Sequence, residues 1–187
     1  MNLSTLEIET SWNDEKKKIL FQIRGELEIR RELHLTSQKF YTKIDRFFSI
    51  PIYLLSGTAG GSLITDKPDR IDDHVLGYIV LLVGITNFLQ RYFKFSNKAD
   101  KHKISLHEYD KILKDINLMV ASEIEKINAN MFIINIQQQY DRLIETSPNV
   151  LKRIKNKVIK KISRKKNIFI NIDELPKLSY DIVLNNI

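Results

Sequence analysis

The sequence contains no cysteine among its 187 residues. This absence excludes a disulfide framework, a thiolate nucleophile and a metal site with cysteine ligands. Glycine and proline together contribute only 10 residues, which argues against a loop-rich or fibrous chain. At this length the chain has room for one domain and little more.

Charge is missing from two long runs in the middle of the chain. Residues 47–65 (FFSIPIYLLSGTAGGSLIT) contain 19 residues without a charged side chain, and residues 75–90 (VLGYIVLLVGITNFLQ) contain 16. A helix needs roughly 20 mostly apolar residues to cross a bilayer. The second run reaches that length when His74 and the aromatic residues up to Phe93 serve as interfacial ends. The runs predict a transmembrane helical hairpin with spans at about 47–65 and 74–93, and a pair of buried helices in a soluble core is the alternative.

Basic residues flank the two runs on their outer sides. Lys39, Lys43 and Arg46 precede the first run, Arg91 and Lys94 follow the second, and the connecting loop holds four acidic against two basic residues. Because Lys and Arg are enriched on the cytoplasmic side of membrane proteins, we expect an integral membrane protein with both termini in the cytoplasm. The residues before the first run mix both charges in a helical pattern, so we expect no secretory signal.

Small residues crowd the first run in the sequence SGTAGGS. A phosphate-binding loop would place a Lys after its glycines, and none is present. Small residues four apart lie on one helix face and let a neighbouring backbone come close. In the second run an amide side chain shares a face with two glycines, and it either packs against another helix or is hydrated near the interface. The residues predicted to pack helices or line a pore are Ser56, Gly57, Gly60, Gly61, Gly77, Gly84 and Asn87.

Charged segments with helical periodicity surround the hairpin and complete an all-α fold class. Residues 1–46 predict a cytoplasmic N-terminal helix, and Pro51 predicts a break or bend close to the membrane. Ser105 and Glu108 have the spacing of a capping box that would open a long amphipathic helix within residues 94–147. About 40 residues would form a rod of roughly 60 Å. Its apolar stripe resembles that of a coiled coil and needs a partner, either the N-terminal helix or another subunit.

Residues 148–187 form a C-terminal tail with a concentrated positive charge. Residues 152–166 hold nine basic residues and no acidic one, which leaves 21 basic against 23 acidic residues elsewhere. The apolar residues Leu151, Ile154, Val158 and Ile162 fall on one side of a helix. Anionic lipid headgroups are the favoured partner, and nucleic acid is less favoured because no aromatic residue interleaves the basic ones. The predicted polyanion-binding residues are Lys152, Arg153, Lys155, Lys157, Lys160, Lys161, Arg164, Lys165 and Lys166.

Catalytic patterns are not found. The four histidines have no paired metal-ligand spacing, and the sequence has no nucleophile elbow and no dinucleotide fingerprint. We therefore expect neither an enzyme nor a metal or cofactor site.

The chain resembles the SLATT family, two-transmembrane effector domains associated with nucleotide second-messenger systems. The resemblance covers roughly residues 15–145 and rests on the charged helix, the tight hairpin and the segment FLQRYFKFSNKADKHKISLHEYDKILKDI. In that segment the family-like positions are Ala99, His102, Tyr109 and Leu113. The resemblance implies an oligomeric membrane effector of antiviral defence that forms a pore when an upstream signalling protein triggers it.

Two functional hypotheses follow. The first is a homo-oligomeric membrane effector that forms a pore or perturbs the membrane after an upstream signal. The second is a non-conducting scaffold or tether, for instance a viral membrane component, whose basic tail binds lipid headgroups or nucleic acid.

Overall fold

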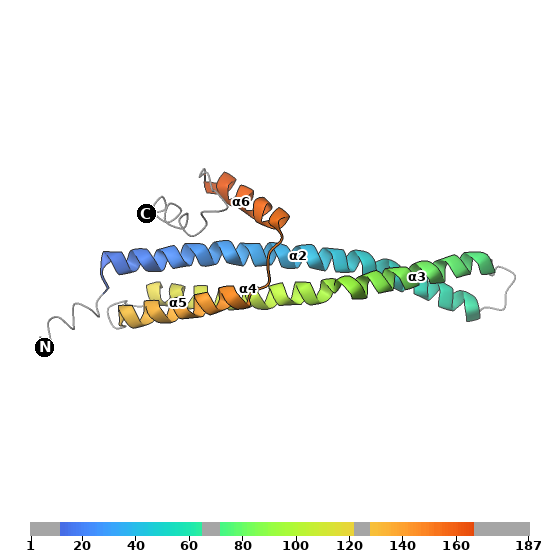
Figure 1. The fold of residues 1–187 in the computed structure, drawn as a ribbon, viewed down its shortest axis with the longest axis horizontal. Helices are drawn as coiled ribbons and strands as arrows, with labels where there is room; N and C mark the ends of the chain where they lie inside the picture. The colour runs from blue at the N-terminus through green and yellow to red at the C-terminus, as the bar shows by residue number, and fades with distance from the viewer. Residues whose placement is uncertain (1–11, 65–71, 122–127, 167–187) are drawn as a thin grey trace, which may run out of the picture. The chain divides into compact units, whose positions relative to one another are not determined.

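The computed structural model of this chain describes residues 12–64, 72–121 and 128–166 (Figure 1). Every regular element in these residues is an α-helix, and the described residues contain no strand. This confirms the predicted all-α class. The helices divide between two compact units, Met1–Ser37 with Lys101–Ile187, and Gln38–Asp100. The unit boundaries fall inside two helices, α2 and α4, so each of these helices contributes to both units.

Helix α2 (Asp14–Ile64) is 51 residues long. Its N-terminus is capped by the Asn13 side chain, which accepts a hydrogen bond from the backbone N–H of Lys16 at 2.8 Å. The acidic residues Asp14 and Glu15 in the first turn interact favourably with the positive end of the helix dipole. The break expected at Pro51 is not observed, because the helix continues through this residue. A proline inside a helix removes one hydrogen bond, and the intact turns on both sides maintain the helix around that loss.

The second half of α2 pairs with α3 (Asp73–Phe93) within the unit Gln38–Asp100. The Asp72 carboxylate caps α3 by accepting the N–H of His74 at 2.9 Å. At the other end, Gln90 donates to the carboxylate of Asp45 at 3.1 Å and to the hydroxyl of Ser49 at 2.7 Å. The limits of α3 agree closely with the predicted span 74–93. The predicted span 47–65 is the last part of the much longer α2, which ends at Ile64 but has no boundary near residue 47. The two-span hairpin therefore stays a prediction. Most of the predicted connection between the spans lies outside the described residues.

Lys94 separates α3 from α4 (Phe95–Ala121). Its backbone is left-handed, with φ 50° and ψ 47°, and its N–H donates to the carbonyl of Gln90 at 3.0 Å. Left-handed backbone is unfavourable for a residue with a Cβ, so the chain ends one helix here and starts another. Aromatic rings surround this junction. Phe93 and Phe48 each stack on Phe95, with centroid distances of 5.4 and 5.7 Å.

The other unit is a helical bundle with its own hydrophobic core. The first half of α2, most of α4 and α5 (Ala129–Thr146) lie side by side (Figure 1). Apolar residues at spacings of three and four on each helix meet in this core, as the amphipathic pattern requires. The core cluster consists of Leu20, Ile23, Leu27, Tyr109, Ile112, Leu113, Ile116, Ile133, Ile136, Tyr140 and Leu143.

The single long helix predicted within residues 94–147 is wrong. The chain forms α4 and α5, and the hydroxyl of Tyr109 lies 3.4 Å from that of Ser147, just after α5. A straight rod would separate these residues by roughly 57 Å. Asn128 starts the second helix by accepting the N–H of Met131 at 3.2 Å. The apolar stripe therefore finds its partner in the other half of the same segment and in α2.

The capping box expected at Ser105 is also wrong, because α4 begins ten residues earlier at Phe95. Ser105 lies inside the helix and is 5% exposed. Its hydroxyl donates to the carbonyl of Lys101 at 3.3 Å, a hydrogen bond to the preceding turn that serine can form inside a helix.

The basic tail contains α6 (Lys152–Lys166), which folds against the bundle unit. Its buried residues are Ile154, Val158 and Ile159, at 4%, 1% and 5% exposure, whereas Leu151 is 44% exposed. Of the predicted apolar face, Ile154 and Val158 are therefore buried, Ile162 is half-buried and Leu151 is exposed, and Ile159 is buried in addition. The apolar side of α6 is covered by protein.

Candidate functional site

Most side chains of the helix α3 are apolar, and most of these apolar side chains are exposed. Within the described residues, the stretch His74–Ala121 is the one found long and apolar enough to cross a membrane, and only 6% of its apolar window is buried. The core helix of a soluble domain would have its apolar side chains buried. Length, composition and exposure together make α3 a candidate membrane span.

The α2–α3 pair exposes large apolar side chains on both helices. Tyr53 and Leu54 on α2 are 76% and 68% exposed, and Tyr78 and Phe88 on α3 are 73% and 65% exposed. Apolar surface this extensive marks an interaction with lipid or protein. The exposed residues are Phe47, Ile50, Tyr53 and Leu54 on α2, and Val75, Tyr78, Val80, Leu81, Leu82, Ile85, Phe88, Tyr92 and Phe93 on α3.

The glycines of the predicted small-residue surface have open space where a side chain would begin. A Cβ atom added to any of five glycines would meet no atom within 4 Å. Close helix packing would bring neighbouring atoms to such positions, so α2 and α3 do not use these glycines against each other. Ser56 and Asn87 are exposed as well. The five glycines are Gly57, Gly60, Gly61, Gly77 and Gly84.

The predicted basic residues of α6 lie on its outer side. Among the described side chains, Lys155 is half-buried, and Lys161 is 67% exposed and forms an ion pair with Glu32 at 2.6 Å. The remaining ones, Lys152, Arg153, Lys157, Lys160 and Arg164, are exposed. The side chains of Lys165 and Lys166 lie outside the described set. The helix thus turns a positive face outwards while its apolar face is buried.

The four family-like positions occupy one buried face of α4. His102 and Tyr109 are 2% and 0% exposed, and Ala99 and Leu113 are 6% and 8% exposed. Spacings of three, seven and four residues place them on one side of the helix. Three of them pack within the bundle, and Ala99 belongs to the unit Gln38–Asp100.

A pair of buried histidines joins α2 to α4 in the bundle. The Nδ1 atoms of His34 and His102 are 3.0 Å apart, and the two side chains are 3% and 2% exposed. The ring of Tyr109 lies against His34 with a centroid distance of 5.3 Å. Small buried serines, Ser37 and Ser105, follow each histidine by three residues and bond to their own helices. The two helices therefore carry the same local pattern, His-x-x-Ser, on facing surfaces.

Burial keeps this pair neutral. Burial, together with smaller contributions from the nearby His102 and Arg30, lowers the pKa of His34 to about 4. Burial also lowers the pKa of His102. Desolvation penalises the charged form of an imidazole, so the pair at neutral pH shares a single Nδ1 proton between two nitrogens.

A second polar group crosses the bundle between α2 and α5. Tyr140 donates its hydroxyl hydrogen to the Glu26 carboxylate at 2.7 Å and accepts a bond from Nε of Arg30 at 2.8 Å. Burial and the hydrogen bond to Glu26 raise the pKa of Tyr140. The neutral phenol of Tyr140 therefore connects the Glu26 carboxylate to the Arg30 guanidinium through two hydrogen bonds inside the bundle.

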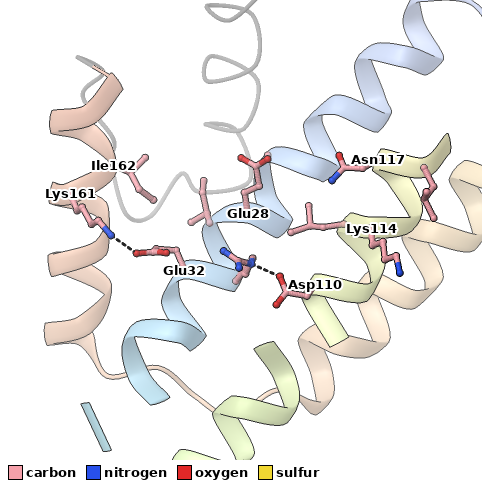
Figure 2. Close-up of a pocket in the computed structure, with 12 residues that line it drawn as sticks. Glu28, Glu32, Asp110, Lys114, Asn117, Lys161 and Ile162 are labelled. Atoms are coloured by element: carbon pink, nitrogen blue, oxygen red, sulfur yellow. Dashed lines mark hydrogen bonds and ion pairs between the residues drawn. The ribbon is translucent and has the colours of Figure 1, made fainter. Parts of the chain in front are cut away.

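An open pocket of about 670 Å³ lies among α2, α4 and α6 (Figure 2). Lys161 of α6 reaches Glu32 of α2, Arg31 of α2 forms an ion pair with Asp110 of α4, and Asn117 lines the α4 side. The volume is in the range of small-molecule sites. The charged side chains around it balance: Glu28, Glu32 and Asp110 are acidic, and Arg31, Lys114 and Lys161 are basic.

Sequence reasoning did not find the histidine pair, the Tyr140 group or the pocket. The signal for the first is the repeated pattern of HLTS at 34–37 and HKIS at 102–105, which places polar residues in the apolar stripe of two helices. The Tyr140 group has no such signal, because Tyr140 is more than 100 residues away from both Glu26 and Arg30. The described residues contain no cluster of three or more side chains that could hold a metal ion.

Comparisons with protein-family models, with curated proteins and with solved structures found no match. A functional assignment therefore has to be argued from the positions, exposure and chemistry of the side chains described above.

Proposed function

We propose that this chain is a two-span membrane protein that associates through its hairpin and forms a pore or perturbs the membrane in response to an upstream signal. The observation that carries the proposal is the uncovered apolar surface of the α2–α3 pair, in a chain whose other unit buries its apolar residues in a core. The SLATT resemblance points in the same direction.

The dimensions of the hairpin fit a bilayer. The 21 residues of α3 extend for about 31 Å, close to the hydrocarbon thickness of roughly 30 Å. Both segments are helical, so their backbone polar groups are satisfied without water, as a lipid environment requires. Aromatic rings and the basic residues Arg46, Arg91 and Lys94 gather at one end of the pair. This arrangement suits a cytoplasmic interface.

The open small-residue surface supports association between copies. In hydrocarbon, helices associate by close packing at Gly and Ser and by hydrogen bonds between polar side chains. The five glycines with open space around them allow close packing. Asn87 can form a hydrogen bond between helices, and its amide would be unfavourable if it faced lipid alone. A second copy of the hairpin would satisfy both, and a ring of Asn87 amides would give such an assembly a polar lining.

The test is ion flux through liposomes that contain the purified chain, with the oligomeric state measured in parallel. We expect an oligomer that leaks ions, directly or after its trigger is supplied. We expect Gly57→Leu and Gly61→Leu to lower flux and oligomer population at least tenfold, because a leucine separates the packed backbones. Leu55→Phe is the matched control, since it enlarges the opposite face of the same helix. Glycine variants that assemble and leak like the parent and the control would contradict the proposal.

The scaffold hypothesis is supported by one observation, the positive outer face of α6. In this alternative the hairpin is only an anchor, and the tail binds an anionic partner. A stable oligomer that keeps liposomes sealed under every trigger tried would favour it.

A further inference from the structure

The His34–His102 contact depends on the number of protons that the two rings carry. With Nδ1 atoms 3.0 Å apart, one nitrogen must donate an N–H and the other must accept it. Binding of one more proton turns both nitrogens into donors that face each other. The hydrogen bond between the rings is then replaced by repulsion between two N–H groups. Because His34 and His102 are almost completely buried, water cannot relieve this repulsion.

We propose that the His34–His102 pair is a proton-sensitive latch between α2 and α4, closed when the pair shares one proton and opened when acidification adds a second. The inference concerns the bundle unit and does not depend on whether the protein conducts ions.

The groups around the latch favour opening once the second proton binds. Arg30 lies one turn before His34 on α2 and adds a positive charge. From α4, the ring of Tyr109 covers His34, and its hydroxyl reaches Ser147 after α5. The acidic groups in this part of the bundle already have partners: Glu26 accepts from Tyr140, Asp110 pairs with Arg31, and Glu32 pairs with Lys161 of α6.

The direction of the pH effect follows from the pKa values. Burial holds the pKa of His34 at about 4 in the closed bundle, whereas an imidazole that reaches water titrates near 6.5. The closed form is therefore fully favoured above about pH 6.5. Between about pH 6.5 and 4, each unit of acidification lowers the closed-to-open ratio by up to about tenfold for one histidine. The direction is the same for His102, whose pKa burial also lowers.

The test uses the absence of cysteine. Thr36→Cys and Lys103→Cys place one spin label on each helix close to the latch, and the distance between labels is measured on the full chain in lipid nanodiscs. We expect a narrow distribution near pH 7.5 and a longer, broader one near pH 5. His107→Gln is the matched control, because His107 lies exposed on the same helix, and it should respond like the parent. His34→Gln can still donate to His102 but leaves one titrating ring, so its response should be smaller.

Two results would overturn the latch. One is a distance distribution in the parent that does not change with pH. The other is a His34→Gln/His102→Gln variant that opens with acid as the parent does. If that variant fails to close at neutral pH, the ¹⁵N signals of the parent imidazoles decide the question. Ordinary titration of both rings near pH 6.5 would reject the proposal, and titration well below that value would support it.

Discussion

At the scale of single residues, the bundle is specified by a few polar side chains in an otherwise apolar core. The His34–His102 contact and the bonds of Tyr140 to Glu26 and Arg30 each join helices that are far apart in sequence. Apolar packing tolerates a slide of one helix along another more readily than directional bonds do. These contacts therefore set the register of α2 against α4 and α5, as well as adding to stability.

Loss of the Tyr140 hydroxyl should destabilise the bundle. Tyr140→Phe leaves the Glu26 carboxylate and the Arg30 guanidinium without their shared partner, which should lower the free energy of unfolding by about 1–3 kcal/mol. Chemical denaturation followed by circular dichroism in a mild detergent measures this change.

Tyr109→Phe is the control within the same core. The Tyr109 hydroxyl lies 3.4 Å from the neutral hydroxyl of Ser147, a longer and uncharged hydrogen bond, so its removal should cost clearly less. An equal or larger decrease in the free energy of unfolding for Tyr109→Phe would mean that the charged partners of Tyr140 add no stability beyond that of a neutral hydrogen bond.

At the scale of helices, the sequence was informative where the pattern was long and uniform. The limits of α3 agree with the predicted span 74–93, whereas α2 ends close to the end of the predicted span 47–65 but begins at Asp14. A long uncharged run can be recognised in the sequence without information from distant parts of the chain. The reversal between α4 and α5 was not predicted, since an amphipathic stripe has the same period whether the chain continues or folds back. Asn128 was the available cue, as a good N-cap residue before an apolar helix.

The candidate sites also differ in how far the sequence alone predicts them. The small residues and the basic residues were predicted because they are close together in sequence, and most of those whose side chains the structure describes are exposed. The histidine pair and the pocket require contacts between helices that sequence spacing alone does not define.

The two faces of α6 should respond differently to substitution. Its apolar face is buried and its basic face is exposed. Replacement of Lys152, Arg153, Lys157 and Lys160 by glutamine should therefore leave the fold intact. It should weaken binding to vesicles that contain phosphatidylserine by at least a hundredfold, since each basic residue near an anionic surface contributes about 1 kcal/mol.

The measurement is vesicle binding by the full chain held in nanodiscs of neutral lipid. The control replaces four exposed lysines of α4, namely Lys101, Lys103, Lys111 and Lys114, and so removes the same charge elsewhere. If both quadruple variants lose binding equally, the effect comes from net charge and α6 has no particular role.

At the scale of the whole chain, two units with different surfaces share two helices. The bundle unit buries its apolar residues among α2, α4 and α5, and the unit Gln38–Asp100 leaves most of its apolar residues exposed. We interpret this contrast as one unit that folds in water and one that folds in lipid. Helix α2 belongs to both units and contains the first proposed span, whereas Lys94 separates α4 from α3, which contains the second.

The central claim is that residues 47–65 and 74–93 cross a membrane as a hairpin, and cysteine labelling tests it most directly. Single cysteines at Asp69→Cys, between the spans, and at Glu145→Cys, at the end of α5, are treated in cells with a maleimide that cannot cross membranes. The account predicts that Asp69→Cys reacts in intact cells and that Glu145→Cys reacts only after permeabilisation. Labelling of both positions from the same side, or release of the protein from membranes by alkaline carbonate, would contradict it.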